Sequence, residues 1–266
     1  LRHTDKPIMS WPVATIGENE KVFKMIEMVM GEGYLASHYF VTASVCALSP
    51  LQYAQESADT IIAYARANQP VTVLTAPMTG VSTPISDIGA LVAQNAELLA
   101  GIVLAQLVQP GVPVIYGTAT YAADMRSGAF ITGSPLSNLI DRAALQLAQS
   151  LYHMPTRTLA GNTDAKVPDI QAGYETMQNY IQLLMGGTHM INECLGILDG
   201  MMTVSYEKYI IDEEMLRRVG CMMRGLDTSE ASFDMGVLLE TPHMESFLMH
   251  ESTLAACSGQ WQPDVA

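Results

Sequence analysis

The sequence predicts an α/β fold built on a parallel sheet. Short apolar runs alternate with longer helical patterns about every 30–45 residues, an order typical of parallel strands joined by crossover helices. The chain contains neither a GxGxxG sequence nor a P-loop, and an open nucleotide-binding sheet is expected to carry one after its first strand. A TIM-type (β/α)8 barrel is therefore favoured. About six strand–helix units can be counted against the eight of a complete barrel, so we expect a barrel that lacks its N-terminal strand–helix units.

The strands and helices are predicted from these patterns in chain order. The predicted strands are Pro7–Val13, Tyr34–Thr42, Val71–Ala76, Val112–Gly117, Thr156–Gly161 and His189–Cys194. The predicted helices are Glu18–Met30, Pro50–Asn68, Pro84–Gln109, Pro135–His153, Pro168–Met185 and Asp212–Arg224. Ser49-Pro50 and Ser134-Pro135 each place an N-cap residue and a first-turn proline at the start of a helix.

No linker or low-complexity stretch divides the chain. We expect residues 1–225 to form the barrel portion. The helical pattern weakens after Gly225, and residues 226–266 are predicted to be a C-terminal extension of helix and loop in the same domain. This extension is a candidate for packing on a partner or a neighbouring subunit, so a homo-oligomer is expected.

Composition and charge exclude several classes of function. Of 266 residues, 49% are apolar and 15% are charged, which is enough apolar content for a sizeable core. The formal charge of −14 and the lack of a basic patch argue against nucleic acid and anionic membrane surfaces as partners. The most apolar stretch, 88–108, is interrupted by Gln94, Asn95 and Glu97, so we expect a helix buried in protein and no membrane span. The four cysteines form no CxxC pair, which favours a reduced, cytoplasmic setting.

The carboxyl ends of the strands should carry the active site, as they do in parallel barrels. Polar and aromatic residues at or just after the predicted strand ends are Trp11, His38, Tyr39, Thr79, Tyr116, Thr118, Tyr121, Asp124, Arg126, Asn162, Thr163, Asp164, Lys166, Asn192 and Glu193. The faces of aromatic rings attract quaternary ammonium groups. Packing of the barrel mouth would explain the same rings.

The loop 161–169 is the most polar of the predicted strand-end loops. Asp164 and Lys166, framed by Gly161 and Pro168, could position a charged substrate. The alternative is an ordinary helix N-terminus, whose acidic residues interact with the helix dipole. A metal site is not indicated, because no HxH, ExxH or HExxH spacing is present.

Three segments carry a resemblance to a known family: GALVAQNAELLAG at 89–101, PGVPVIYG at 110–117 and DAKVPDIQAGYE at 164–175. Together they resemble the trimethylamine methyltransferase family of corrinoid-dependent amine and betaine methyltransferases, over most of residues 1–225. The resemblance implies a TIM barrel that takes a methyl group from a tertiary or quaternary amine. The group passes to the Co(I) of a corrinoid held by a separate protein, and then enters methanogenesis or one-carbon metabolism. No corrinoid is then expected to be bound tightly to this chain.

The resemblance also bears on length and substrate. Family members are longer at the N-terminus, so the chain matches their C-terminal portion. This sequence contains no pyrrolysine, the residue thought to hold or activate trimethylamine in one branch of the family. A quaternary amine such as a betaine is therefore the expected substrate, since its cationic nitrogen is already a competent leaving group.

The resemblance implies roles for the strand-end residues. Trp11, Tyr39 and Tyr116 are expected to surround the ammonium, with His38 beside them. Asp164 and Glu193 are the candidate catalytic residues and balance its charge, while Lys166 positions a substrate charge. Arg126 is expected to bind a betaine carboxylate; Arg157 lies at a strand start and is placed at the opposite end of the barrel.

Two other functions remain open at this point. One is a metal-dependent barrel lyase that uses Asp164, His189 and Glu193. The other is non-catalytic: an unclosed barrel exposes two sheet edges that must be covered, and such a chain could act as a binding or assembly module.

Overall fold

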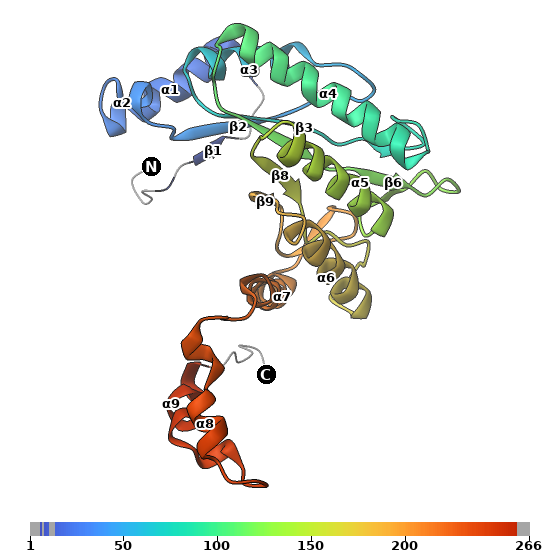
Figure 1. The fold of residues 1–266 in the computed structure, drawn as a ribbon. Helices are drawn as coiled ribbons and strands as arrows, with labels where there is room; N and C mark the ends of the chain where they lie inside the picture. The colour runs from blue at the N-terminus through green and yellow to red at the C-terminus, as the bar shows by residue number, and fades with distance from the viewer. Residues whose placement is uncertain (1–5, 7, 11–13, 260–266) are drawn as a thin grey trace.

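A curled parallel sheet forms the centre of the computed structural model, which describes residues 6, 8–10 and 14–259 (Figure 1). Its six strands follow the order β1-β2-β3-β5-β8-β9, and every neighbouring pair is parallel. The strands are β1 (Ile8–Ser10), β2 (Val41–Cys46), β3 (Val71–Thr75), β5 (Val114–Thr118), β8 (Thr156–Leu159) and β9 (Met190–Asn192). The curl brings the two edge strands together, because Asn192 Nδ2 in β9 donates a hydrogen bond of 3.1 Å to Met9 Sδ in β1.

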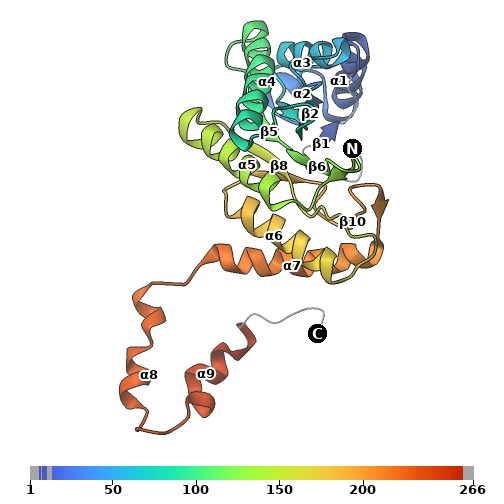
Figure 2. The same ribbon diagram turned by 90° about the vertical axis from the view of Figure 1, so that its right-hand side faces the viewer.

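Helices cover the outer face of this sheet (Figure 2). The helices of the body are α1 (Ile16–Met30), α2 (Tyr34–Ser37), α3 (Gln55–Arg66), α4 (Asp87–Val108), α5 (Pro135–Gln146), α6 (Ile170–Leu184) and α7 (Tyr206–Arg224). Two short helices, α8 (Met235–Glu240) and α9 (Glu251–Ala256), lie away from the sheet in the C-terminal segment. Because side chains alternate along a strand, Val41, Ala43 and Val45 of β2 share one face, where they join Leu98 and Ile102 of α4 in the main apolar core. The remaining residues of β2 therefore face the concave side.

Short strands lie beyond the main sheet. β4 (Met78–Thr79), β6 (Tyr121–Ala123) and β7 (Phe130–Ile131) form one small sheet, and β10 (Ile197–Leu198) pairs with β11 (Thr203–Val204). All five follow the carboxyl ends of the main strands in the chain, so they surround the edge of the sheet where a parallel fold places its functional loops.

The predicted α/β class and parallel order are confirmed, and six parallel strands are present among the described residues. A closed barrel of eight strands is not confirmed by the described residues. One strand boundary was predicted wrongly, because Tyr34–Ser37 is a short helix and β2 begins only at Val41. The His38 ring stacks on Tyr34 with centroids 4.2 Å apart and closes this helical turn. Aromatic content had favoured a strand there.

Of the two helix starts predicted at a proline, the one at Pro135 is confirmed and the one at Pro50 is wrong. Ser134 is the N-cap of α5, and Pro135 is its first residue. Ser49-Pro50 lies instead in a turn, and α3 begins at Gln55. The physical reason is the environment of Ser49, whose hydroxyl donates 2.7 Å to Glu97 Oε2 of α4 and so holds the turn away from the helix start.

Helix α4 is only half buried. By length and composition alone this 22-residue helix could cross a membrane, and 39% of its most apolar window is buried. One face packs against the sheet through Leu98 and Ile102, as expected for a core helix. The opposite face exposes apolar residues that include Val92 and Leu107.

The segment after Gly225 forms an arm that projects from the body of the molecule (Figures 1 and 2). It carries the short helices α8 and α9, and none of its described residues belongs to the apolar core clusters. Leu238, Leu239 and Met244 are among its exposed apolar residues. The loss of the helical pattern after residue 225 therefore corresponds to a real change in packing.

Candidate active site at the carboxyl ends of the strands

Four ionisable side chains lie near the carboxyl ends of the strands, and we call them the concave-face cluster. They are Cys46 at the end of β2, Tyr121 in β6, Arg157 in β8 and Glu193 directly after β9. The Arg157 charge lowers the pKa of Cys46, and Glu193 raises the pKa of both Tyr121 and Arg157. Cys46 and Glu193 lie at the ends of their strands, Tyr121 follows β5, and the pairing register brings Arg157 to the same end.

The pairing register explains how Arg157 joins this group. Arg157 pairs with Gly117, Gly117 with Leu74, and Leu74 with Cys46. Arg157 is the second residue of β8, whereas Cys46 is the last residue of β2. The strands are staggered, as a curled sheet requires, so the start of β8 is level with the carboxyl end of β2. The predicted position of Arg157 at the opposite end of the sheet is therefore wrong.

The side chain of Arg157 faces the concave side of the sheet. Its neighbour Thr156 faces the other way, because Thr156 Oγ1 accepts a 3.1 Å hydrogen bond from Gln149, in the π-helical turn that follows α5. Arg157 is 1% exposed, and its Nε and Nη1 atoms have no hydrogen-bond partner among the described residues. Burial lowers the pKa of Arg157, and the nearby Glu193 carboxylate opposes this effect.

Glu193 lies at the carboxyl end of β9, where the sequence placed it. Its side chain is exposed, and its φ of 50° lies in the left-handed region that glycine, asparagine and aspartate tolerate best. Residues held in this conformation cluster at functional sites. Burial raises the pKa of the neighbouring Tyr121 phenol, and Glu193 is the next largest cause.

A cleft of about 910 Å³ adjoins this cluster. Its lining includes three residues that the sequence selected, Asp124, Asp164 and Lys166. Phe130, Met201 and Met202 also line it. The ring of Tyr121 forms the connection: its centroid is 4.1 Å from that of Phe130, and its hydroxyl lies 3.8 Å from Met201 Sδ. The cleft and the concave-face cluster are thus two parts of one site.

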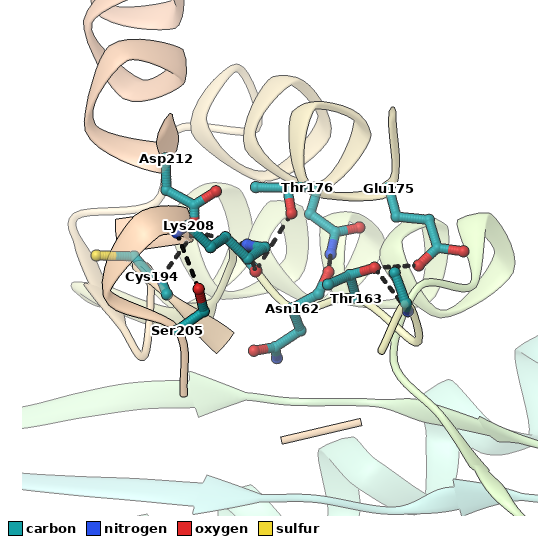
Figure 3. A network of polar contacts seen from close by, with 12 residues as sticks. Asn162, Thr163, Glu175, Thr176, Cys194, Ser205, Lys208 and Asp212 are labelled. Carbon is teal, nitrogen blue, oxygen red and sulfur yellow. Dashed lines mark hydrogen bonds and ion pairs between the residues drawn. The ribbon is translucent and has the colours of Figure 1, made fainter. Parts of the chain in front are cut away.

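Asp164 is held by the two residues that directly follow β7. Its Oδ1 accepts hydrogen bonds of 2.8 and 3.0 Å from the Thr132 amide and hydroxyl, and its Oδ2 accepts one of 3.0 Å from the Gly133 amide. Glu175 of α6 in turn accepts from the Asp164 amide at 2.9 Å and from the Thr163 hydroxyl at 2.6 Å (Figure 3). Asp164 therefore fixes two loops relative to each other at the edge of the cleft.

A buried ion pair anchors the other end of the same loop. Lys208 Nζ of α7 donates to Asp212 Oδ2 at 2.6 Å and to the Gly161 carbonyl at 3.1 Å (Figure 3). Asp212 Oδ2 also accepts from the Gly196 amide at 2.7 Å. Helix α7 is thereby joined to the segments that follow β8 and β9, the two strands that carry Arg157 and lead to Glu193.

Most of the remaining predicted site residues are not brought into this region as expected. Arg126 is 93% exposed and lies 3.3 Å from Asp124. Lys166 lines the cleft, but its side chain is 82% exposed and lies 3.8 Å from Asp199. Tyr116 falls on the outer face of β5, where its hydroxyl donates 3.0 Å to Asn95 of α4, because its register position faces the helices. Trp11 lies outside the described residues.

His38 and Tyr39 precede β2, so they lie at the amino ends of the strands. Their predicted position at the mouth is wrong, because the strand that they were expected to end begins after them. His189 precedes β9, and its Nδ1 lies 2.9 Å from the hydroxyl of Thr156, which faces the outer side of the sheet. It is therefore separated from Asp164 and Glu193, and no group of three potential metal ligands occurs within the described parts of the chain.

The comparisons with known proteins agree with one another. The family model described as "Trimethylamine methyltransferase (MTTB)" matches residues 1–266. The chain is 41% identical over 187 residues to a proline betaine:corrinoid methyltransferase of Eubacterium limosum, covering 70% of this chain and 38% of that protein. It is 36% identical over 223 residues to a glycine betaine methyltransferase of Desulfitobacterium hafniense (strain Y51), covering 84% and 46%.

A third relative is a trimethylamine methyltransferase of Desulfitobacterium hafniense (strain DSM 10664 / DCB-2), 32% identical over 245 residues, with 91% of this chain and 49% of that protein covered. The chain thus spans less than half the length of each of these three relatives.

Proposed function

Because this chain belongs to the trimethylamine methyltransferase family, we propose that the complete protein moves a methyl group from a methylated amine to a corrinoid carried by a partner protein. The observation that carries the proposal is the match of the family model to the whole chain. The site supports it, since an aromatic pair and a carboxylate lie together at the carboxyl ends of the strands.

The proposed architecture is a (β/α)8 barrel of which this chain supplies six strands. The curled parallel sheet and its staggered register support this. A ring of eight needs two further strands, and these would have to replace the direct contact between Asn192 of β9 and Met9 of β1. The chain covers less than half of its relatives' length, which is consistent with part of the barrel being encoded elsewhere in the protein.

The proposed substrate is a quaternary amine of the betaine class. Two of the three relatives described above are named for betaines. The physical argument is that a quaternary nitrogen already carries its positive charge, so it leaves as a neutral amine when the N–CH₃ bond breaks. The protein then has to hold the cation, orient that bond and exclude water.

The ammonium is proposed to lie against the Tyr121 and Phe130 rings, with Glu193 as its counter-charge. The Tyr121 and Phe130 rings are tilted by 44° to each other, and the faces of such rings attract a desolvated cation. Asp164 holds the cleft wall by its bonds to Thr132 and Gly133, and so sets the position of these rings relative to the strands. Arg126 is 93% exposed and does not line the cleft, so we give it no part in binding. Lys166 lines the cleft and is proposed to position a substrate charge at its rim.

A corrinoid delivered by the partner protein would supply the nucleophile that accepts the methyl group, while the electron pair of the N–CH₃ bond stays with the nitrogen. The described residues fit such an encounter. The cleft beside Tyr121 is lined by Phe130, Met201 and Met202, and both Met202 and Glu193 are exposed to an approaching partner. The residues of this chain bind and orient the amine.

The two alternatives have less support. A metal-dependent lyase would need Asp164, His189 and Glu193 together, and His189 lies beside Thr156 on the outer side of the sheet. A non-catalytic module is consistent with the two sheet edges of this chain, but it does not explain the strained Glu193 beside an aromatic pair.

Location and assembly complete the proposal. All four cysteines lie within the described residues and are free, which supports a reducing, cytoplasmic setting. We propose that residues 226–266 extend the same domain. The exposed apolar residues of the arm support association with a second copy.

The experiment that tests this function mixes the complete protein with reduced corrinoid protein and a panel of methylated amines. We expect the absorbance of the methylated corrinoid to grow with one class of amine and to be insensitive to a chelator. Loss of transfer in the chelator would favour the lyase. Absence of transfer with every amine, from a protein of correct mass and sedimentation, would favour the non-catalytic module.

A further inference from the structure

Arg157 has an environment that a structural arginine does not normally have. Its side chain is 1% exposed, yet Nε and Nη1 donate to no atom of the described chain. The ion pairs of the described residues do not include it. A buried guanidinium without a partner is costly, since it has lost its hydration and gained no hydrogen bonds in exchange.

Other buried polar atoms on the concave face are also without hydrogen-bond partners in the described structure. Ser44 Oγ in β2 and Thr72 Oγ1 in β3 are such atoms, and the two residues are register partners. Asn192 Oδ1 in β9 is another. Buried polar atoms in folded proteins are nearly always paired, so an accumulation of unpaired ones on a single face indicates a ligand or water site. The outer face of the same strands is filled instead by the apolar core.

We propose that Arg157 binds the carboxylate of a zwitterionic substrate whose ammonium group lies between Glu193 and Tyr121. This deepens the proposed function and rests on it, because it assigns the specificity for a carboxylate-bearing amine to a named side chain. The planar guanidinium presents parallel N–H groups that match the two oxygens of a carboxylate. Side-on binding of a carboxylate uses Nε with Nη2 and end-on binding uses Nη1 with Nη2, so the unpaired Nε and Nη1 leave both approaches open.

The charges of the cluster are arranged for a zwitterion. Arg157 and Glu193 act on each other electrostatically without forming an ion pair. A ligand that carries both signs of charge can therefore enter between them and neutralise both. A simple cation would satisfy Glu193 and leave the buried guanidinium unpaired. The site is thus expected to discriminate strongly, since rejecting a ligand that leaves a buried charge unpaired is more effective than rejecting one of the wrong size.

The test compares two ligands that share a trimethylammonium group. Glycine betaine carries a carboxylate and choline carries a hydroxyl, so their binding to the complete protein is measured by titration calorimetry. We expect Arg157→Gln to weaken glycine betaine binding by about 10- to 100-fold and choline binding by less than about 3-fold. Arg157→Lys keeps the charge without the planar fork and should give an intermediate loss. Arg126→Gln is the control, because its guanidinium is 93% exposed.

The outcomes that overturn the inference are specific. Unchanged glycine betaine affinity in Arg157→Gln, or a wild-type protein that binds choline as tightly as glycine betaine, removes the assignment. If Arg157→Gln weakened the binding of both ligands equally, Arg157 would have a structural role and the inference would be overturned. Circular dichroism of each variant checks that the variant is folded.

Methyl transfer to the reduced corrinoid protein, measured on the same samples, separates the two hypotheses. Transfer from glycine betaine with an unchanged KM in Arg157→Gln would leave the proposed function intact and remove this inference. If glycine betaine binding depends on Arg157 but no methyl group is transferred, the inference stands and the proposed function is removed.

Discussion

Arg157 lies level with Cys46 in the sheet, although Arg157 is the second residue of β8 and Cys46 is the last residue of β2. The register connects them through Gly117 and Leu74, one residue on each intervening strand. All four positions therefore belong to one layer across the concave face. This stagger brings a cation from the start of one strand to a thiol at the end of another.

The reactivity of Cys46 provides a test of this relationship. Burial raises the pKa of the Cys46 thiol, and the Arg157 charge opposes this effect. Arg157→Gln should therefore raise the pKa further and slow alkylation of Cys46 at pH 8 by about 2- to 10-fold, since the thiolate is the reactive form. Mass spectrometry of iodoacetamide-treated protein measures the rate at each cysteine.

Cys194 is the internal control for that measurement. Its pKa is raised chiefly by burial, and its charged neighbour is Asp212 rather than Arg157. Its alkylation rate should not change in the variant. Equal slowing at both cysteines would mean that Arg157→Gln altered the fold, and an unchanged rate at Cys46 would show that the two residues do not interact.

Much of the fold could be predicted from the sequence, because crossover helices and parallel strands leave local signals. Ser134 and Pro135 start α5 where their types predict, and Glu193 follows its strand as expected. Arg157 could not be placed in the same way. Counting residues from a strand start assumes that all strands begin at one level, whereas the stagger is set by pairing between distant segments.

Tyr39 and Tyr116 show two further limits. Tyr39 was misplaced because Tyr34–Ser37 forms a helical turn, which the aromatic content of the segment does not reveal. Tyr116 lies on the predicted strand, but the face to which its side chain points depends on the register. Its hydroxyl donates a hydrogen bond to Asn95 of α4, on the helical side of the sheet. A shift of one residue exchanges the two faces of a strand, so strand position alone does not identify which aromatic residues reach the site.

Glu193 is expected to reduce stability while it serves binding. Its φ of 50° costs a glutamate about 1 kcal/mol, whereas asparagine tolerates this conformation. Glu193→Asn should therefore raise the free energy of unfolding by about 0.5–1 kcal/mol and, by removing the carboxylate, raise the KM for a quaternary amine about 10-fold or more. Urea denaturation and the methyl-transfer assay measure the two effects.

Met244→Asn is the matched control for Glu193. Met244 has a φ of 68° and is exposed in the C-terminal arm, outside the described site. The same gain in stability is expected there without any change in KM. If Glu193→Asn left the KM unchanged, Glu193 would have no part in binding the ammonium.

Asp141 is expected to give the unfolding free energy a distinct pH dependence. Burial raises the pKa of this carboxyl to about 6, even though the Thr120 amide donates to both of its oxygens at 3.0 and 3.1 Å. Between pH 4 and 6 the folded state holds a proton that the unfolded state has lost. The contribution of Asp141 to stability is therefore full below pH 4 and falls by about 3 kcal/mol as the pH rises to 7.

Asp141→Asn separates this contribution from those of the other carboxyl groups. The asparagine can still accept from the Thr120 amide, but it does not titrate. We expect the difference in unfolding free energy, variant minus wild type, to rise by about 3 kcal/mol between pH 4 and 7. Denaturation curves across that range measure it, and parallel pH profiles of the two proteins would contradict the assignment.

Lys208 and Asp212 form a buried pair whose disruption should be costly. Both side chains are 1% exposed or less, and Lys208 also donates to the Gly161 carbonyl. Lys208→Met leaves the Asp212 carboxylate buried with the Gly196 amide as its remaining donor, which is expected to cost about 3–5 kcal/mol of unfolding free energy. Urea denaturation measures this loss.

The same helix provides the comparison that identifies burial as the cause. Glu213 and Arg217 form an ion pair with the same spacing on α7, but both side chains are about half exposed. Arg217→Met should cost about 0–1 kcal/mol, because water screens such a pair and solvates the partner that remains. Replacing both buried partners, as Lys208→Met with Asp212→Leu, removes the unpaired charge and should recover much of the stability lost in Lys208→Met. If the double variant were no more stable than Lys208→Met alone, the stability lost in Lys208→Met would come from the missing hydrogen bond to the Gly161 carbonyl. The role of Lys208 would then be to hold the loop that follows β8.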